Sequence, residues 1–300
     1  MSRNFLFYIN PISGTGNKKI LEQHIHSRWK MEKLNYSISD TDINGNYDFL
    51  PEKILQEKIT DIVICGGDGT INNICSFIKG VDVRVGIIPM GSGNGLALAA
   101  GISKNINKAI DIIIKARSKW IDGFEVNHHF GCMLAGIGLD AQIAHDFSRQ
   151  KKRGLWTYIR LSATTFFRSP LYPIELMIEN KRITTDIRFI SIANSNQFGN
   201  HVTIAPKASL SDGLLDVVVV RKKSRLLTAC SVFFQIIRGK VISKPSDLDS
   251  DKTVLYFQTA NLDIHNPSMA PLHIDGEPAE TSDHIRICII PAAIQLIMPE

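Results

Sequence analysis

The chain has 300 residues, and its 44% hydrophobic and 21% charged residues are typical of a globular protein with a sizeable core. Its formal net charge of +5 is too small to indicate a nucleic-acid partner, although it modestly favours an anionic membrane surface. The five cysteines form no CxxC pair, no apolar run approaches the roughly 18 residues of a membrane span and no signal-peptide pattern opens the chain, so we expect a cytoplasmic protein that is at most peripheral at the inner membrane surface.

Residues 1–120 alternate between short apolar strands and helical runs. We predict strands near 5–9, 34–39, 61–65 and 83–88, and helices near 17–31, 51–58, 71–79, 94–100 and 106–116. This alternation is typical of a doubly wound, mainly parallel sheet with helices on both faces. The β-branched run 62–64 is typical of a strand that is buried on both sides.

Three of these strands run into glycine-rich loops, and a helix follows each loop. The loops are Asn10-Pro11-Ile12-Ser13-Gly14, Gly66-Gly67-Asp68-Gly69-Thr70 and Gly91-Ser92-Gly93-Asn94. A strand, a glycine turn and a helix N-terminus together present backbone N–H groups and a positive dipole end to phosphate. Because the carboxyl ends of parallel strands open on one side of the sheet, we predict a single nucleotide site there. Asp68 would repel a bare phosphate, which implies a cation or a proton in transit.

After Trp120 the pattern changes to short strands with few helices between them. We predict strands near 124–127, 130–135, 174–179, 183–192, 215–220, 253–257, 261–265, 272–275 and 285–290. This pattern is typical of an antiparallel β-sandwich. We therefore expect a nucleotide-binding α/β domain over residues 1–122, with the segment 291–300 packed back onto it, and a β-rich substrate domain over residues 123–290.

The three loops, in this order and spacing, resemble the diacylglycerol kinase catalytic domain family, which includes bacterial diacylglycerol kinases and the related sphingosine and ceramide kinases. The resemblance continues through residues 136–141, 205–208 and 212–216 and the motif Asp275-Gly276-Glu277, so it covers nearly the whole chain. It implies the same two-domain fold, with the active site in the cleft between the domains. One departure is Gly95, which stands where similar loops carry an aspartate and leaves the metal or phosphate contacts there open.

The resemblance also assigns roles to single residues. Asp275 matches the proposed proton acceptor, and a carboxylate at the end of an apolar strand is partly desolvated, which suits a base. Asp68 and Asp122 match the acidic network that organises catalytic Mg²⁺, and a structural Mg²⁺ would be held by Asp212 and the carbonyls of Ser209 and Leu214. The nucleotide-binding positions are Asn10, Pro11, Ser13, Gly14, Thr41, Gly66, Gly67, Asp68, Gly69, Thr70, Gly91, Ser92, Gly93, Asn94 and Glu277. Taken singly, these motifs are equally typical of polar turns and hairpins.

The leading hypothesis is an ATP-dependent lipid kinase that uses Mg²⁺ and phosphorylates a lipid alcohol, with diacylglycerol as the default acceptor. The alternatives are an NAD kinase-like enzyme, which shares the Gly-Gly-Asp-Gly loop, and a nucleotide-binding sensor without catalysis. Two basic stretches that lead into apolar runs, at 149–166 and 221–240, would suit transient membrane contact, although helices packed on a sheet with solvated charged ends are the commoner explanation of such a pattern. A homodimer is left open. None of the nine histidines has the sequence spacing of a zinc ligand.

Overall fold

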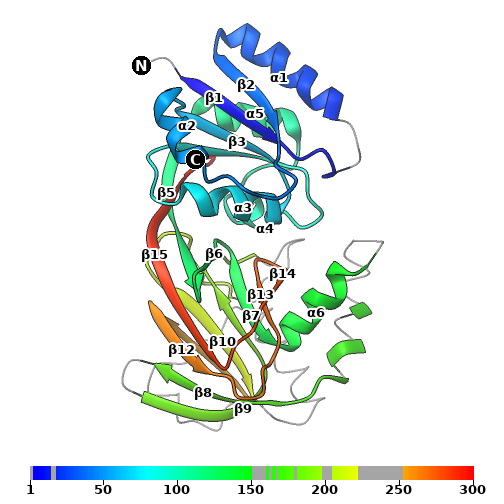
Figure 1. The fold of residues 1–300 in the computed structure, drawn as a ribbon, viewed down its shortest axis with the longest axis vertical. Coiled ribbons are helices and arrows are strands. Elements are labelled where there is room, and N and C mark those ends of the chain that lie inside the picture. The colour runs from blue at the N-terminus through cyan, green and yellow to red at the C-terminus, as the bar shows by residue number, and fades with distance from the viewer. Residues whose placement is uncertain are drawn as a thin grey trace. The chain divides into compact units, whose positions relative to one another are not determined.

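The computed structural model describes residues 3–14, 18–150, 160–161, 164–166, 168–178, 181–197, 205–221 and 253–300. The chain divides into two compact units, which are drawn as ribbons in Figure 1. The first unit contains Met1–Ile121 and Ala292–Glu300, and the second contains Asp122–Pro291. The first is built on a parallel sheet and the second on antiparallel strands, so the predicted fold class is confirmed.

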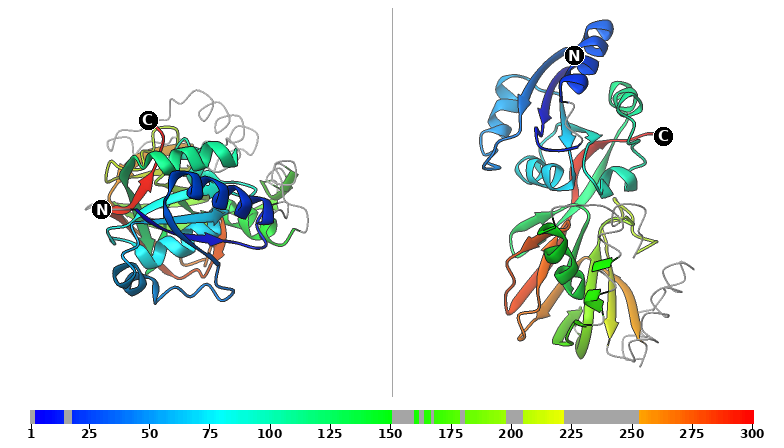
Figure 2. Two further views of the ribbon diagram at one scale, coloured as in Figure 1. Left: turned by 90° about the horizontal axis from the view of Figure 1, so that it is seen from above. Right: turned by 90° about the vertical axis from the view of Figure 1, so that its right-hand side faces the viewer.

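The first unit has a parallel sheet in the order β2-β1-β3-β4-β15. Its strands are β1 (Asn4–Ile9), β2 (Asn35–Asp40), β3 (Asp61–Gly66), β4 (Arg84–Pro89) and the last part of β15 (His284–Ile297). Its helices are α1 (Lys18–Glu32), α2 (Leu50–Gln56), α3 (Asp68–Ile78), α4 (Gly95–Ala99) and α5 (Ile106–Lys115). In Figure 2, left, α1 and α5 lie on one side of this sheet, and α2 and α3 lie on the other.

Strand β1 explains why helices cover both faces. Phe5 and Phe7 meet the edge of Trp29 on α1, with ring centroids 5.1 and 4.8 Å apart. Tyr8 points to the other face and meets Tyr47 at 5.2 Å. All five side chains are buried. Because successive residues of a strand point to opposite faces, this one short strand contributes to two separate hydrophobic layers.

Parallel pairing brings the carboxyl ends of four strands to one edge. The N–H of Asn10 donates to the carbonyl of Cys65 at 2.9 Å, and the N–H of Met90 donates to the carbonyl of Gly66 at 2.9 Å. The N–H of Thr41 donates to the carbonyl of Ile9 at 3.1 Å. The loops that follow β1, β2, β3 and β4 therefore all start from the same edge of the sheet.

The second unit is antiparallel throughout its described pairs. Its elements are β5 (Ser118–Val126), which begins in the first unit, β6 (His129–Gly131), β7 (Leu134–Gly138), α6 (Leu139–Ser148), β8 (Tyr172–Ile178), β9 (Lys181–Ala193), β10 (Leu215–Arg221), β11 (Val254–Thr259), β12 (Asn261–His265), β13 (Leu272–Ile274), β14 (Glu277–Ala279) and the first part of β15. The long strand β9 pairs with β10 along one edge. Along the other edge it pairs first with β8 and then, toward its carboxyl end, with β7. One hydrophobic core joins these strands. Among the helices of the described residues, none has the length and apolar character to cross a bilayer.

Several elements differ from the prediction: β5 begins at Ser118 and not near residue 124, and α6 and β14 were not predicted. The apolar run 130–135 is not one strand, because the chain breaks between β6 and β7 at Cys132 and Met133. Strand β15 is longer than predicted and continues past residue 290 to pair with β4, with Gln295 opposite Arg84. At Ala292, where β15 passes from the second unit to the first, φ is 51°, an uncommon value for a residue with a side chain.

Candidate active site

Two glycine loops of the first unit meet backbone to backbone. A Cβ atom added to Gly91 would lie 2.5 Å from the Cα of Gly67, and one added to Gly67 would lie 3.1 Å from the Cα of Gly91. A side chain at Gly91 would collide with the backbone of the other loop, and one at Gly67 would force the loops apart by a few tenths of an ångström, so this close approach favours glycine at both positions and requires it at Gly91. Helix α3 begins at Asp68, directly after Gly67. These residues form a corner of bare backbone at the carboxyl edge of the sheet.

Two asparagines fix the shape of this corner. Asn94 closes its own loop, because its Oδ1 accepts from the N–H of Gly91 at 2.8 Å and its Nδ2 donates to the carbonyl of Gly91 at 2.6 Å. Its φ of 54° is left-handed, a conformation that asparagine tolerates better than most residues. Asn10, at the end of β1, donates from Nδ2 to Oγ1 of Thr70 at 2.8 Å. The loops after β1, β3 and β4 are therefore tied into one arrangement.

Asp68 places a carboxylate in the same corner. Its Oδ1 lies 3.4 Å from the N–H of Leu96 in the first turn of α4. A Cβ atom on Gly93 would lie 3.0 Å from its Oδ2, so glycine at that position leaves room for the carboxylate. The positive end of the α3 dipole also favours an acidic residue in the first turn.

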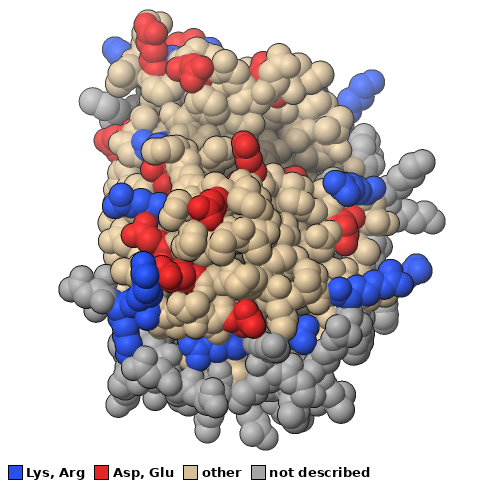
Figure 3. All heavy atoms as spheres, turned by 60° about the horizontal axis from the view of Figure 1, so that its bottom comes forward, with Lys and Arg blue, Asp and Glu red and all other residues tan. Residues whose placement is uncertain are grey.

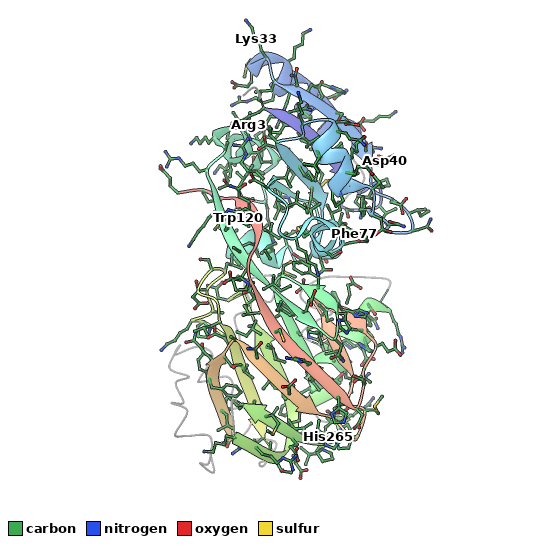
Figure 4. All side chains as sticks on the ribbon, turned by 60° about the vertical axis from the view of Figure 1, so that its left-hand side comes forward. Arg3, Lys33, Asp40, Phe77, Trp120 and His265 are labelled. Carbon is green, nitrogen blue, oxygen red and sulfur yellow. The ribbon has the colours of Figure 1, made fainter. Side chains whose placement is uncertain are left out.

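A groove lies beside the end of β2, close in sequence to Thr41. Its volume is about 670 Å³, and its walls come from α1 and β2. The lining residues are Lys18, Glu22, His26, Tyr36, Ser37, Ile38 and Asp40. Lys18 is paired with Asp40, which is labelled in Figure 4, and this hydrogen bond raises the pKa of the lysine. The sequence did not predict this groove, because its residues form no recognisable motif.

In the second unit, the Asp275 carboxylate is held by the backbone break between β6 and β7. Its Oδ1 accepts from the N–H groups of Met133 at 2.8 Å and Leu134 at 2.9 Å. Its Oδ2 accepts from the N–H of Cys132 at 2.8 Å and lies 3.3 Å from the Sγ of the same residue. Asp275 is only 5% exposed, so a buried charge is matched by three backbone donors and one thiol.

The turn that carries Asp275 is constrained as well. Asp275 has φ of 50°, and the N–H of Gly276 donates to Nδ1 of His273 at 3.3 Å. The other ring nitrogen of His273 lies 3.3 Å from the Asp140 carboxylate, and both side chains are buried. A Cβ atom on Gly136 would lie 2.3 Å from that nitrogen, so glycine in β7 makes room for the imidazole. These contacts fix the direction in which the β13–β14 hairpin presents Asp275.

Asn194 links the surroundings of Asp275 to Asp122. It is fully buried, and its Nδ2 donates to the carbonyl of Asp122 at 2.8 Å and to the carbonyl of Cys132 at 3.0 Å. The Asp122 carboxylate accepts from the N–H of Gly213 at 2.8 Å, and its own N–H donates to the carbonyl of Leu210 at 2.6 Å. The end of β9, the strand β5 and the loop 209–214 are thereby joined.

The loop 209–214 carries the predicted ligands of a structural cation. Asp212 is exposed and accepts from the N–H of Leu214 at 3.2 Å. Burial, with a smaller contribution from the negative charge of Asp212, raises the pKa of Asp216 to about 6, although the hydrogen bond from Gln258 opposes the shift. The loop itself offers the carboxylate of Asp212 and backbone carbonyls, and oxygen donors of this kind fit a hard divalent cation such as Mg²⁺.

The predicted residues fall into two groups. The first unit contains the positions from Asn10 to Gly14, Thr41 and both remaining glycine loops, and the second contains Asp122, Ser209, Asp212, Leu214, Asp275 and Glu277. Glu277 opens β14 and is exposed. The acidic network of Asp68 and Asp122 would draw on both units and stays a prediction. Sequence reasoning missed Cys132 and Asn194, because only the fold shows that they surround Asp275.

Two family models match the chain. The diacylglycerol kinase catalytic domain matches residues 4–126, and the YegS C-terminal NAD kinase beta sandwich-like domain matches residues 133–298. The chain belongs to the family that joins these two domains, a diacylglycerol kinase catalytic domain and a YegS C-terminal domain. The resemblance seen in the loop motifs is therefore confirmed.

Relatives in this family are similar over most of their length. A diacylglycerol kinase of Bacillus subtilis is 27% identical over 285 residues, which are 92% of this chain and 90% of that protein. A probable lipid kinase YegS-like protein of Shewanella frigidimarina is 27% identical over 84% of this chain and 80% of its own. A crystal structure of a diacylglycerol kinase from Bacillus anthracis has the same fold, with a TM-score of 0.73 at 17% identity, over 99% of this chain and 97% of that one.

We predict that Asp275→Asn loosens the break between β6 and β7. An amide has a single acceptor oxygen, so its NH₂ group would face backbone N–H donors that now meet a carboxylate. Hydrogen bonds to charged groups contribute about 1.5–3 kcal/mol each, so the amides of residues 132–134 should exchange with solvent at least about tenfold faster. Hydrogen-exchange mass spectrometry would measure this, with the exposed Asp263→Asn as the control. Unchanged exchange in Asp275→Asn would contradict the structural role of the carboxylate.

Proposed function

We propose that this protein is an ATP-dependent lipid kinase that transfers the γ-phosphate of ATP to a lipid hydroxyl, with diacylglycerol as the preferred acceptor. The observation that carries this proposal is the match to a diacylglycerol kinase catalytic domain followed by a YegS C-terminal domain, together with a fixed, buried carboxylate at Asp275. The names of its relatives, diacylglycerol kinase and probable lipid kinase, support the acceptor class.

The first unit supplies what a triphosphate needs. Phosphoryl transfer depends mainly on positioning and on electrostatic stabilisation of the phosphate oxygens. The Gly67–Gly91 corner offers backbone without side chains, and the N-terminus of α3 opens beside it. Asp68 suits an Mg²⁺–nucleotide complex better than a free nucleotide, because a bound cation offsets the repulsion between carboxylate and phosphate. When bound, Mg²⁺ would neutralise charge on the phosphate oxygens.

The second unit supplies the proton acceptor. Each carboxylate oxygen has about two positions for a hydrogen bond. At Asp275, Oδ1 receives two N–H groups, and Oδ2 receives one N–H and the Cys132 thiol. A thiol is a weak donor, so it is the partner that an alcohol displaces most easily. We infer that the acceptor hydroxyl takes the position of the Cys132 sulfur at Oδ2 and passes its proton to that oxygen.

Of the basic stretches expected to dock on a bilayer, most of 149–166 and all of 221–240 except Arg221 lie outside the described residues. On the face drawn in Figure 3, acidic and basic side chains of the described residues are interspersed. The assignment of a lipid as the acceptor therefore depends on the family and on Asp275, and not on a basic surface.

The central test measures the transfer of label from γ-labelled ATP with Mg²⁺. We expect a labelled, chloroform-soluble product with diacylglycerol, and we expect Asp275→Asn to reduce turnover by a factor of about 10²–10⁴, the usual contribution of a general base. ATP affinity should persist in this variant, because the nucleotide loops belong to the other unit. Label on NAD would favour the dinucleotide kinase, and ATP binding without transfer to any lipid would overturn the proposal.

A second test addresses the nucleotide corner. We predict that Gly91→Ala weakens ATP binding at least about tenfold, since its new Cβ would collide with the backbone of Gly67 and separate the loops. Gly80→Asn is the matched control, because a Cβ at Gly80 has open space and asparagine tolerates its φ of 73°. Calorimetric titration with ATP would measure both variants. Equal affinities in the two would remove the Gly67–Gly91 corner from nucleotide binding.

A third test separates the thiol from the carboxylate. We predict that Cys132→Ala keeps turnover at or above the wild-type value, because it vacates the position that the alcohol must take. Cys132→Ser places a stronger donor there, and a competing hydrogen bond of about 1 kcal/mol would lower kcat about fivefold. Steady-state kinetics at saturating ATP would compare the three proteins. A larger loss in Cys132→Ala than in Cys132→Ser would show that the sulfur is required.

A further inference from the structure

A cluster of two imidazoles and one carboxylate lies in the second unit, outside every motif considered above. His265 ends β12, and Asp283 and His284 stand at the start of β15. The two strands are antiparallel, and their register sets His265 directly opposite His284. One donor atom from each of the three residues lies within 4.8 Å of the others. Figure 4 labels His265 at the end of the second unit where β12 stops.

Two distances within the His265–Asp283–His284 cluster, one from each imidazole to the carboxylate, are close to those between ligands of a small metal ion. The Nε2 atom of His265 lies 3.1 Å from Oδ1 of Asp283, and Nε2 of His284 lies 3.4 Å from Oδ2 of Asp283. Ligand atoms at about 2.0–2.1 Å from a tetrahedral Zn²⁺ are about 3.3 Å apart. Both histidines therefore present the same nitrogen to one carboxylate at nearly the required spacing.

The two rings also have matching orientations. Their centroids are 4.9 Å apart and their planes differ by 19°, so they stack side by side. Both Nε2 atoms lie near the carboxylate of Asp283. Two adjacent protonated imidazoles would repel each other, whereas two neutral imidazoles can share a cation between them.

The backbone that carries these ligands is fixed by other contacts. The N–H of Asn266 donates to the carbonyl of Asp283 at 2.6 Å. The Nδ2 of Asn127 donates to the carbonyl of His284 at 3.1 Å and to Oγ of Ser282 at 2.9 Å. These bonds hold the turn before β15 without help from the cluster itself. The ligand positions are therefore organised in advance, which lowers the entropic cost of binding.

The cluster is also accessible. The alternation along β12 buries Leu262 and Ile264 and turns His265 outward. His265 is 39% exposed and His284 is 80% exposed at the side chain. An ion can reach the three ligands from solvent, and water can complete its coordination. Imidazole ligands favour Zn²⁺, Cu²⁺ and Ni²⁺ over Mg²⁺, which prefers oxygen alone.

We propose that the His265–Asp283–His284 cluster binds one divalent transition-metal ion, with Zn²⁺ as the simplest occupant. The ion is held by the two imidazoles and the carboxylate and joins the last residue of β12 to the first residue of β15. Its role is structural, because it fixes the start of β15 against the end of β12. Strand β15 then continues from the second unit into the first. The site is independent of the kinase reaction, since none of its residues belongs to the nucleotide loops or to the surroundings of Asp275.

The test is a calorimetric titration of Zn²⁺ into the full chain in excess Mg²⁺, which fills oxygen-donor sites. The wild type should bind one Zn²⁺ that is lost in the double variant His265→Gln/His284→Gln, and Asp283→Asn should bind at least about tenfold more weakly. The matched control is His24→Gln, a histidine on α1 that should leave binding unchanged. All of the ligands are at least partly exposed, so the variants should fold, and circular dichroism would verify this.

A second readout uses Co²⁺, whose visible absorption reports ligand geometry. The wild type should give the intense band of four- or five-coordinate Co²⁺, and the double variant should give the weak spectrum of the hydrated ion. If the wild type and the double variant bind Zn²⁺ with the same stoichiometry and affinity, the proposal is overturned. If the wild type binds no Zn²⁺ beyond what the double variant binds, the cluster is only an exposed set of ion pairs.

Discussion

One buried carboxylate determines the local structure of the second unit. Asp275 accepts hydrogen bonds from three consecutive backbone N–H groups, those of residues 132 to 134, between the end of β6 and the start of β7. Two of those groups, on Cys132 and Met133, lie between the strands and point at the carboxylate instead of joining a ladder, so the break in the strand and the buried charge support each other. The backbone of Asp275 is left-handed, and this conformation turns its side chain toward the break.

The first unit depends on a different feature, the lack of side chains at the glycines of its loops. The sheet is parallel, so its loops start from a common edge, but loops with ordinary side chains could not approach as closely as Gly67 and Gly91 do. The side-chain amide of Asn94 then closes the loop by bonding to both the N–H and the carbonyl of Gly91. In the proposed reaction the two units therefore contribute different chemistry: one offers backbone to an anion, and the other offers a charged oxygen to an alcohol.

Much of this organisation could be predicted from the sequence. The alternation of strands and helices up to residue 120 predicted the parallel sheet, and the loop motifs identified the family. The break at Cys132 could not be predicted, because residues 130–135 form a continuous apolar run and the cause of the break lies at Asp275, more than a hundred residues away. The role of Asn194 could not be predicted for the same reason, because its partners are Asp122 on β5 and Cys132 in the break between β6 and β7. The His265–Asp283–His284 cluster has no ligand spacing in the sequence, since strand pairing alone brings its members together.

Asp122, at the border of the two units, connects the loop 209–214 to the surroundings of Asp275. Asp122 is the first residue of the second unit, and its N–H, its carbonyl and its carboxylate are each bonded to a different residue. Two of those partners belong to the loop 209–214, and the third, Asn194, also binds the carbonyl of Cys132, whose N–H and sulfur contact Asp275. A cation in that loop would therefore act on a rigid chain of contacts that ends at the proposed base. Substitutions at Asp122 or Asn194 should be interpreted as changes in the position of Asp275 before any direct role in catalysis is assigned to them.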